Sequence, residues 1–267
     1  MPTDAPAPRF DPASAFRLDG RTAIVTGASA GLGRRFARVL HGAGATVVVA
    51  ARRADRLDAL VADLAADGAE ALAIESDITA DGEGARIVAE TVERFGRLDT
   101  LVNNAGVMLL GPVVDAPVEE WERMVSLNVS ALLACTHAAL PHLLAAAEDS
   151  PRRVADLVNI SSVAGRVPRL GSGVYNLTKH GIGAFSESLR QEVTGRHVRV
   201  SLVEPGAVST ELADHLSESA KAALVQRLAH VERLQASDIA DAISFIVTRP
   251  RHMAVNEILI RPTEQEG

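Results

Sequence analysis

Tyr175 and Lys179 lie one helical turn apart in the sequence, and both belong to residue types that this chain rarely uses. The 267 residues include a single tyrosine and two lysines, Lys179 and Lys221. Residues at positions i and i+4 share one face of a helix. A phenol with its ordinary pKa of about 10 transfers protons poorly at neutral pH, and a neighbouring ammonium together with an oxidised nicotinamide would lower that pKa. The pair therefore predicts proton exchange with a hydroxyl or carbonyl oxygen of a substrate.

Polar side chains at the ends of two apolar runs are further candidates for chemistry. Ser162 ends the run 157–162, thirteen residues before Tyr175. Ligands of open α/β sheets bind beyond the carboxyl ends of the strands, where a serine hydroxyl can orient a substrate oxygen. The amides of 103–104 follow a second run, and Asn128 lies within a helical pattern. An asparagine there is ordinarily a tolerated surface residue.

A glycine-rich segment between a strand-like run and a helical pattern predicts a phosphate-binding loop. The segment reads TGASAGLG over residues 26–33. Glycines let the backbone turn sharply and approach a pyrophosphate, whose charge is stabilised by free N–H groups at a helix N-terminus. The spacing G-x-x-x-G-x-G differs from the common G-x-G-x-x-G fingerprint, so a structural turn stays open as an alternative. The dinucleotide contacts that it predicts are Gly27, Ser29, Ala30, Gly31, Leu32 and Gly33.

Two arginines follow the second strand-like run, at the place where NAD-binding proteins of this type carry an acidic residue. Arg52 and Arg53 are found there instead. Guanidinium groups bind a 2′-phosphate through charge-assisted hydrogen bonds, so NADP is favoured over NAD. A solvated basic helix start is the alternative. After the third run, Asp77 and Ile78 are placed to edge the adenine, although Asp77 is also a candidate helix N-cap.

Short apolar runs and amphipathic stretches alternate along the chain and must position these residues. The strand-like runs are 22–26, 46–50, 71–74, 100–102, 154–160, 198–203 and 257–260. The helical patterns are 31–43, 54–67, 81–95, 117–147, 174–194 and 237–248. Strands that are apolar from end to end imply burial on both faces, and the helices between them imply parallel crossovers. We therefore predict a doubly wound Rossmann-type α/β fold with a seven-stranded parallel sheet, in one domain over residues 20–267.

The segments outside this pattern and the composition narrow the classes of protein further. Residues 1–19 are read as an N-terminal arm, and 148–153 as a solvated loop. A net charge of -7 disfavours a broad nucleic-acid surface, and one cysteine with eight scattered histidines shows no metal-ligand spacing. Cys135 cannot form an internal disulfide and is assigned to packing, which favours a cytoplasmic protein. No window of ~20 uncharged apolar residues predicts a membrane span.

The motifs together resemble the short-chain dehydrogenase/reductase family over residues 20–262. The glycine loop, the NNAG run at 103–106, the spacing of Ser162, Tyr175 and Lys179, and a Pro-Gly pair after the sixth run carry the resemblance. It implies a catalytic tetrad in which the asparagine helps to hold a water that links the lysine to solvent. The implied tetrad is Asn128, Ser162, Tyr175 and Lys179.

The resemblance also implies further contacts with the cofactor. Tyr175 and Lys179 border the nicotinamide, and Lys179 binds its ribose. The other implied contacts are Asn104, Ala105, Gly106, Pro205, Gly206, Val208 and Thr210. Many NADP-using members carry a basic residue where this chain has Ala30, so the prediction of NADP depends on Arg52 and Arg53.

Substrate contacts are predicted from residues that flank the catalytic candidates. Met108, Ser162, Arg166 and Glu211 are the candidates. Packing is the alternative for Met108, a salt bridge for Arg166, and a solvated lid for Glu211. The segments 104–112 and 255–263 resemble bacterial family members that reduce small aldehydes or oxidise 3-hydroxy acids and serine-like alcohols, including clavulanate-pathway aldehyde reductases.

The expected function is that of an NADP-dependent oxidoreductase. It would move a hydride between nicotinamide and a small aldehyde, ketone, alcohol or hydroxy acid. An NAD-preferring dehydrogenase of the same fold and a non-catalytic dinucleotide-binding regulator are the alternatives. The family resemblance implies a homodimer or homotetramer, and no nucleic-acid or membrane partner is expected.

Overall fold

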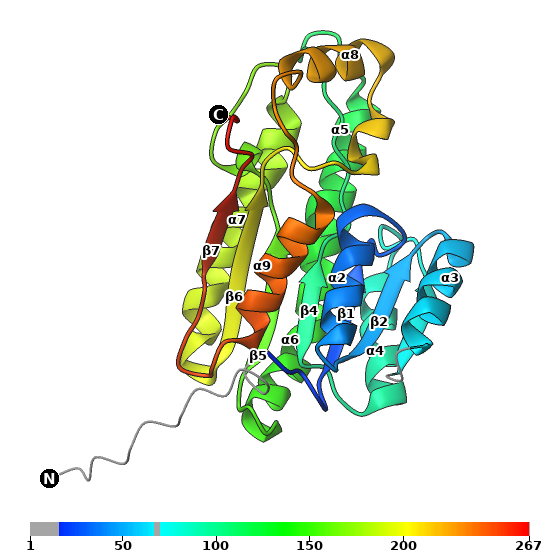
Figure 1. The fold of residues 1–267 in the computed structure, drawn as a ribbon, viewed down its shortest axis with the longest axis vertical. Coiled ribbons are helices and arrows are strands. Elements are labelled where there is room, and N and C mark those ends of the chain that lie inside the picture. Colours follow the sequence, from blue (N-terminus) through cyan, green and yellow to red (C-terminus); the bar gives the residue numbers. More distant parts are fainter. Residues whose placement is uncertain (1–15, 67–69, 267) are drawn as a thin grey trace, which may run out of the picture.

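A parallel sheet of seven strands forms the centre of the structure (Figure 1). The computed structural model describes residues 16–66 and 70–266. The strands are β1 (Thr22–Thr26), β2 (Thr46–Ala51), β3 (Ala71–Glu75), β4 (Thr100–Asn103), β5 (Ala155–Ile160), β6 (Val198–Pro205) and β7 (Glu257–Ile260). Their spatial order is β3-β2-β1-β4-β5-β6-β7. The order reverses between β1 and β4, which is where sheets of this kind bind ligands. The predicted doubly wound fold in a single domain is confirmed.

Helices cover both faces of the sheet and enclose two apolar cores (Figure 1). The helices are α2 (Gly31–Gly42), α3 (Ala54–Ala65), α4 (Glu83–Phe95), α5 (Val118–Val125), α6 (Ala131–Asp149), α7 (Gly173–Val193), α8 (Glu218–Arg227) and α9 (Ala236–Thr248). Phe36 of α2, Leu60 of α3 and Ile243 of α9 are buried together in one core. Ile87 of α4 and Cys135 of α6 are buried in the other, where burial raises the pKa of the Cys135 thiol to about 12. The packing role predicted for this cysteine is confirmed.

Charged side chains tie the strands together at the amino edge of the sheet. Asp99, just before β4, accepts a hydrogen bond from the backbone N–H of Thr22 at 2.9 Å. Asp156 of β5 accepts one from Nε of Arg199 in β6 at 2.7 Å. Arg199 also donates to the carbonyl oxygen of Arg249 at 2.9 Å. Buried charges need such partners, so these contacts hold the strand ends and the end of α9 together at this edge.

The segment Val118–Asp149 is long and apolar enough to cross a membrane by length and composition, contrary to the sequence expectation. In this fold it consists of α5, a π-helical turn η1 (Ser126–Ser130) and α6. Its buried polar residues bond to other segments: Asn128 accepts from the N–H of Val107, and Thr136 accepts from Asn103. The segment therefore packs against the sheet as one of the covering helices.

Two boundary predictions are corrected by burial. The sequence predicts an arm up to residue 19, but Leu18 is 1% exposed and its N–H donates to the carbonyl oxygen of Ala43. Residues 1–15 of that arm lie outside the described residues. The predicted solvated loop 148–153 contains Arg152, whose Nη2 donates to the carbonyl oxygens of Thr248 and Arg249 at 2.7 and 2.8 Å. That loop is anchored to the end of α9.

Candidate active site

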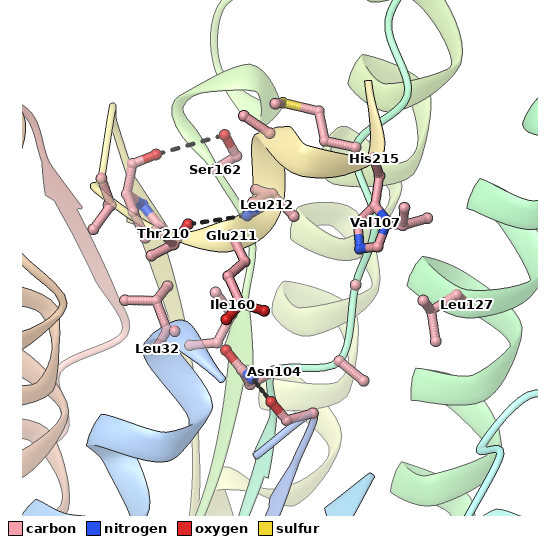
Figure 2. A pocket seen from close by; sticks show the side chains of 18 of the residues that line it. Leu32, Asn104, Val107, Leu127, Ile160, Ser162, Thr210, Glu211, Leu212 and His215 are labelled. Carbon is pink, nitrogen blue, oxygen red and sulfur yellow. Dashed lines mark hydrogen bonds between the residues drawn. The ribbon is translucent and has the colours of Figure 1, made fainter. Parts of the chain in front are cut away.

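A cavity of about 920 Å³ lies at the carboxyl edge of the sheet. Its walls come from the segments that follow β1 to β6, from the start of α7 and from the region of α8. Figure 2 shows it from close by, with Glu211 extending from the short helix η4 (Glu211–His215) toward Leu32, Asn104 and Ile160. The sequence-predicted residues that line it are Gly27, Ser29, Ala30, Gly31, Leu32, Arg52, Arg53, Asp77, Ile78, Asn104, Ala105, Gly106, Met108, Ser162, Tyr175, Lys179, Pro205, Gly206, Val208, Thr210 and Glu211.

The glycine loop leaves space for a pyrophosphate at the start of α2. Gly27 and Gly31 have φ angles of 66° and 52°, which other residues adopt only with strain. A Cβ added to Gly33 would lie 2.4 Å from the carbonyl oxygen of Gly27. Within the described chain, Ala30 gives no side-chain cap and the first turn of α2 has no acidic residue. The N–H groups at this terminus are therefore available to an anion, and the loop fits a dinucleotide pyrophosphate.

The segment after β4 holds the glycine loop in place. Oγ1 of Thr26 accepts hydrogen bonds from the N–H groups of Asn104 and Ala105 at 3.0 and 3.1 Å. Nδ2 of Asn104 donates back to the carbonyl oxygens of Thr26 and Gly27 at 2.9 and 3.2 Å. The same amide nitrogen would lie 2.6 Å from a Cβ on Gly33. These contacts explain why the loop needs a glycine at position 33.

Two arginines meet one carboxylate beside the glycine loop. Arg53 donates to Oγ of Ser29 at 3.0 and 3.1 Å and to Glu211 at 3.1 Å. Arg56, which the sequence analysis did not single out, donates to both carboxylate oxygens of Glu211 at 2.9 and 3.0 Å. Partial burial raises the pKa of Glu211, but the hydrogen bonds from the two arginines outweigh it and lower that pKa overall. The arrangement is suited to binding an anion.

Asp77 forms a local turn after β3. Its Oδ1 accepts from the hydroxyl of Thr79 at 2.7 Å and from the N–H of Thr79 at 3.1 Å. These hydrogen bonds, followed by the charge of Arg52, lower the pKa of Asp77. Because α4 begins only at Glu83, Asp77 is not the N-cap of that helix. Asp77 and Ile78 both line the cavity, on the side that the adenine prediction requires.

Tyr175 and Lys179 share one face of α7, and each is 6% exposed. Nζ of Lys179 lies 5.8 Å from the centre of the Tyr175 ring and donates to the carbonyl oxygen of Ile160 at 2.9 Å. Burial lowers the pKa of Lys179 to about 8. Burial also raises the pKa of Tyr175 to about 12, against a hydrogen bond with Ser162 that lowers it. The sequence prediction also counts the charge of an oxidised nicotinamide; from the protein groups alone, desolvation of the phenolate outweighs the polar neighbours of Tyr175.

Ser162 is held at the end of β5 by the turn that follows it. Its Oγ accepts from the N–H of Ala164 at 3.1 Å and lies 3.5 Å from the carbonyl oxygen of Pro205 (Figure 2). Ser162 and Tyr175 both line the cavity. The hydroxyl and the phenol therefore border the same space.

Asn128 lies behind the cavity wall, in the π-helical turn η1. Its Oδ1 accepts from the N–H of Val107 at 2.8 Å, and its Nδ2 donates to the carbonyl oxygen of Val107 at 2.9 Å and to Thr178 at 3.3 Å. A Cβ on Gly106 would lie 3.3 Å from Asn128 Oδ1 and 3.9 Å from Lys179 Nζ. Asn128 thus joins the segment after β4 to α7, close to the lysine.

Comparison with known proteins identifies the family. The family model described as short chain dehydrogenase matches residues 21–221. This chain belongs to the short-chain dehydrogenase family. The family match identifies it as an NAD(P)-dependent dehydrogenase/reductase.

Individual relatives of this short-chain dehydrogenase are similar over nearly its whole length. An uncharacterized oxidoreductase of Staphylococcus saprophyticus is 34% identical over 92% of this chain and 97% of its own length. A serine dehydrogenase in a closed form complexed with NADP+ has a TM-score of 0.83 at 30% identity, covering 92% of this chain and 96% of that one. A short chain dehydrogenase from Burkholderia cenocepacia in complex with NADP has a TM-score of 0.80 at 30% identity, covering 92% and 98%.

Only some of the predicted substrate contacts of this short-chain dehydrogenase line the cavity. Met108 and Ser162 line the cavity, whereas Arg166 does not. Nε of Arg166 donates to both oxygens of Glu204 at 2.8 Å, and its Nη2 pairs with Glu257. Glu204 is 1% exposed and needs this partner, so the prediction of a substrate-binding Arg166 is corrected to a structural ion pair. Glu211 lines the cavity, with its carboxylate paired to Arg53 and Arg56.

Several basic residues of the cavity wall had no sequence signal. Arg56, Arg123, Arg169 and Arg227 line the cavity. Each lies outside the family motifs, in a helix or loop where an arginine is ordinarily solvated. Arg56 is paired with Glu211, and the position of all four at the cavity is visible only in the fold.

Proposed function

We propose that this short-chain dehydrogenase is an NADP-dependent oxidoreductase of small carbonyl compounds and alcohols, including aldehydes, ketones and hydroxy acids. The observation that carries the proposal is the convergence of Tyr175, Lys179 and Ser162 at the cavity reached by the glycine loop. A phenol and an ammonium buried this completely are costly to keep in a protein that only binds a dinucleotide. The non-catalytic alternative is therefore disfavoured.

The preference for NADP over NAD rests on the arginines after β2. Arg53 and Arg56 already hold one carboxylate, Glu211, at hydrogen-bond distance, and Ser29 fixes the Arg53 guanidinium. A 2′-phosphate is a stronger acceptor for the same groups. Serine dehydrogenase and the Burkholderia cenocepacia protein are similar in fold and are complexed with NADP, which supports the proposal.

The mechanism assigns proton transfer to Tyr175 and substrate positioning to Ser162. When bound, the nicotinamide supplies the hydride acceptor or donor. As the phenolate, Tyr175 accepts the hydroxyl proton during oxidation, and as the phenol it donates one to the carbonyl oxygen during reduction. The Ser162 hydroxyl hydrogen-bonds the same oxygen, and the Lys179 charge favours the phenolate. Hydrogen bonds of Asn128 hold the segment that follows β4 against α7, close to Lys179.

A cofactor and substrate screen tests the proposed function. Purified protein is mixed with NADPH or NADH and a panel of aldehydes, ketones and oxo acids, and with NADP or NAD and the matching alcohols and hydroxy acids. Turnover is followed by the absorbance of the reduced nicotinamide. We expect turnover with a higher kcat/KM for the NADP couple, and loss of turnover in Ser162→Ala. A higher kcat/KM with the NAD couple would favour the NAD-preferring alternative. The homo-oligomer and the cytoplasmic location stay predictions.

A further inference from the structure

Arginine side chains gather at the catalytic end of the cavity without carboxylate partners. Arg169 and Arg227 line the cavity, and Arg261 lies beside the wall residue Gly206. None of these arginines forms an ion pair with a carboxylate among the residues that the structure describes, and Nε of Arg261 is buried with no hydrogen-bond partner there. Burial and, after it, the charges of Arg227 and Arg261 lower the pKa of Arg169. Like charges held this close repel, and a bound anion would relieve the repulsion.

The acidic residues of the cavity wall already have other partners. Their partners are Thr79 for Asp77, Arg53 and Arg56 for Glu211, and Lys221, at 3.5 Å, for Asp214. No carboxylate in this wall therefore neutralises Arg169 or Arg227, as far as the structure describes the chain.

The backbone of Arg169 is fixed next to the catalytic tyrosine. Its carbonyl oxygen accepts hydrogen bonds from the N–H of Ser172 at 3.2 Å and from Nδ2 of Asn176 at 3.3 Å. Ser172, Tyr175 and Asn176 all line the cavity. Arg169 therefore extends from the turn that leads directly into the part of α7 carrying Tyr175.

The arginines at this end are distinct from those expected to hold the cofactor phosphate. Arg53 and Arg56 follow β2, whereas Arg261 follows β7, and β6 lies next to β7 in the sheet. Arg53 and Arg56 are paired with Glu211, whereas Arg169 lies at the turn before Tyr175 and pairs with no carboxylate among the described residues, so the catalytic end has its own capacity for an anion.

We propose that the substrate is a hydroxy acid or an oxo acid, whose carboxylate binds Arg169 and Arg227 while its hydroxyl or carbonyl oxygen lies at Tyr175 and Ser162. This inference rests on the proposed function and names the substrate class of the same site. Guanidinium groups bind carboxylates through paired, charge-assisted hydrogen bonds. In oxidation the C–H bond of the alcohol carbon breaks, its hydride passes to the nicotinamide and the hydroxyl proton passes to the phenolate form of Tyr175. The carboxylate is unchanged and serves to orient the acid.

Matched acids and amides test the proposal, because the amide keeps the shape and removes the charge. The dissociation constants of 2-, 3- and 4-hydroxybutanoate and of their amides are measured on NADPH-loaded protein by the change in NADPH fluorescence. We expect at least one acid to bind on the order of 10-fold more tightly than its amide, the range of a charge-assisted contact. Arg169→Gln should remove most of this difference. Arg196→Gln, which changes an exposed arginine paired with Glu148, should keep it.

Two results would overturn the substrate class. One is equal binding of every acid and its amide by the wild-type protein, and the other is an acid preference that survives in Arg169→Gln. Turnover measured on the same compounds separates this proposal from the one on which it rests. If neutral ketones react as well as the acids, the proposed function stands and the acid class fails. If nothing reacts, the proposed function fails, and the acid-to-amide binding ratio still decides whether Arg169 recognises a carboxylate.

Discussion

Replacing Glu211 by glutamine should raise the affinity for NADP while leaving the affinity for NAD nearly unchanged. The carboxylate of Glu211 neutralises Arg53 and Arg56, the two arginines that we assign to the 2′-phosphate. NADP must therefore displace this carboxylate, whereas NAD has no 2′-phosphate and need not compete. The glutamine keeps the size of the side chain and removes its charge.

The size of the effect follows from the exposure of the two ion pairs. The side chains of Arg53, Arg56 and Glu211 are 43%, 41% and 48% exposed. Solvent-exposed pairs contribute about 0.2–1 kcal/mol each, so the two together amount to about 1 kcal/mol. At about 1.4 kcal/mol per factor of ten, NADP should bind roughly 5-fold more tightly to Glu211→Gln.

Fluorescence titration with NADPH and NADH at low ionic strength measures both affinities. Asp214→Asn is the matched control, since it removes an acid of the same short helix that lies near Lys221 and not near Arg53. Added salt should shrink the gain, because the exposed pairs are screened. The reasoning is refuted if Glu211→Gln changes both affinities equally or changes neither, or if Asp214→Asn gives the same selectivity change.

Three other predictions concern stability and packing. The free energy of unfolding of the wild type relative to Lys179→Met should rise between pH 8 and 10.5. The pKa of Lys179 is about 8 in the folded protein and 10.5 in the unfolded chain. Between these values the unfolded chain binds more protons than the folded protein, so the folded state gains stability as the pH rises. Denaturant titrations across this range measure the rise, and a pH-independent difference would contradict it. Gly33→Ala should weaken the binding of NADPH and of NADH equally, because its Cβ meets the carbonyl oxygen of Gly27 at 2.4 Å. Fluorescence titration measures both affinities, and unchanged affinities would contradict the tight packing. Cys135 should react with a thiol reagent only after denaturation, since burial raises its thiol pKa to about 12, and rapid labelling of the native protein would show otherwise.

The sheet was predictable because strands that are buried on both faces are visible in the sequence as runs of mostly apolar residues. Every residue of β1 and β6 is buried, and both runs are rich in apolar residues, although β6 also carries Arg199, Ser201 and Glu204. Helix α8 was not predicted, because none of its residues is buried and it has no apolar face to read. The helical pattern over 117–147 was found, but its interruption by a π-helical turn at Asn128 was not, since that turn is set by hydrogen bonds to Val107 and Thr178.

The candidate site was likewise predictable only in part from the sequence. The spacing of Ser162, Tyr175 and Lys179 was visible in the sequence, because one helix and one strand end carry all three. The burial of the Tyr175 phenol, which raises its pKa, could not be predicted, because only the fold shows it. Arg166 was assigned to substrate since its neighbour Glu204 lies 38 residues away and is paired with it only in the folded chain.

The central claim is that Tyr175 transfers the substrate proton and is not needed to bind the cofactor. Tyr175→Phe keeps the ring and removes only the hydroxyl. In the presence of a substrate that the wild type turns over, kcat of this variant should fall by on the order of 100-fold or more, the usual contribution of a positioned acid or base. The dissociation constant for NADPH, titrated on the same sample, should stay that of the wild type. Undiminished turnover by Tyr175→Phe would contradict the account.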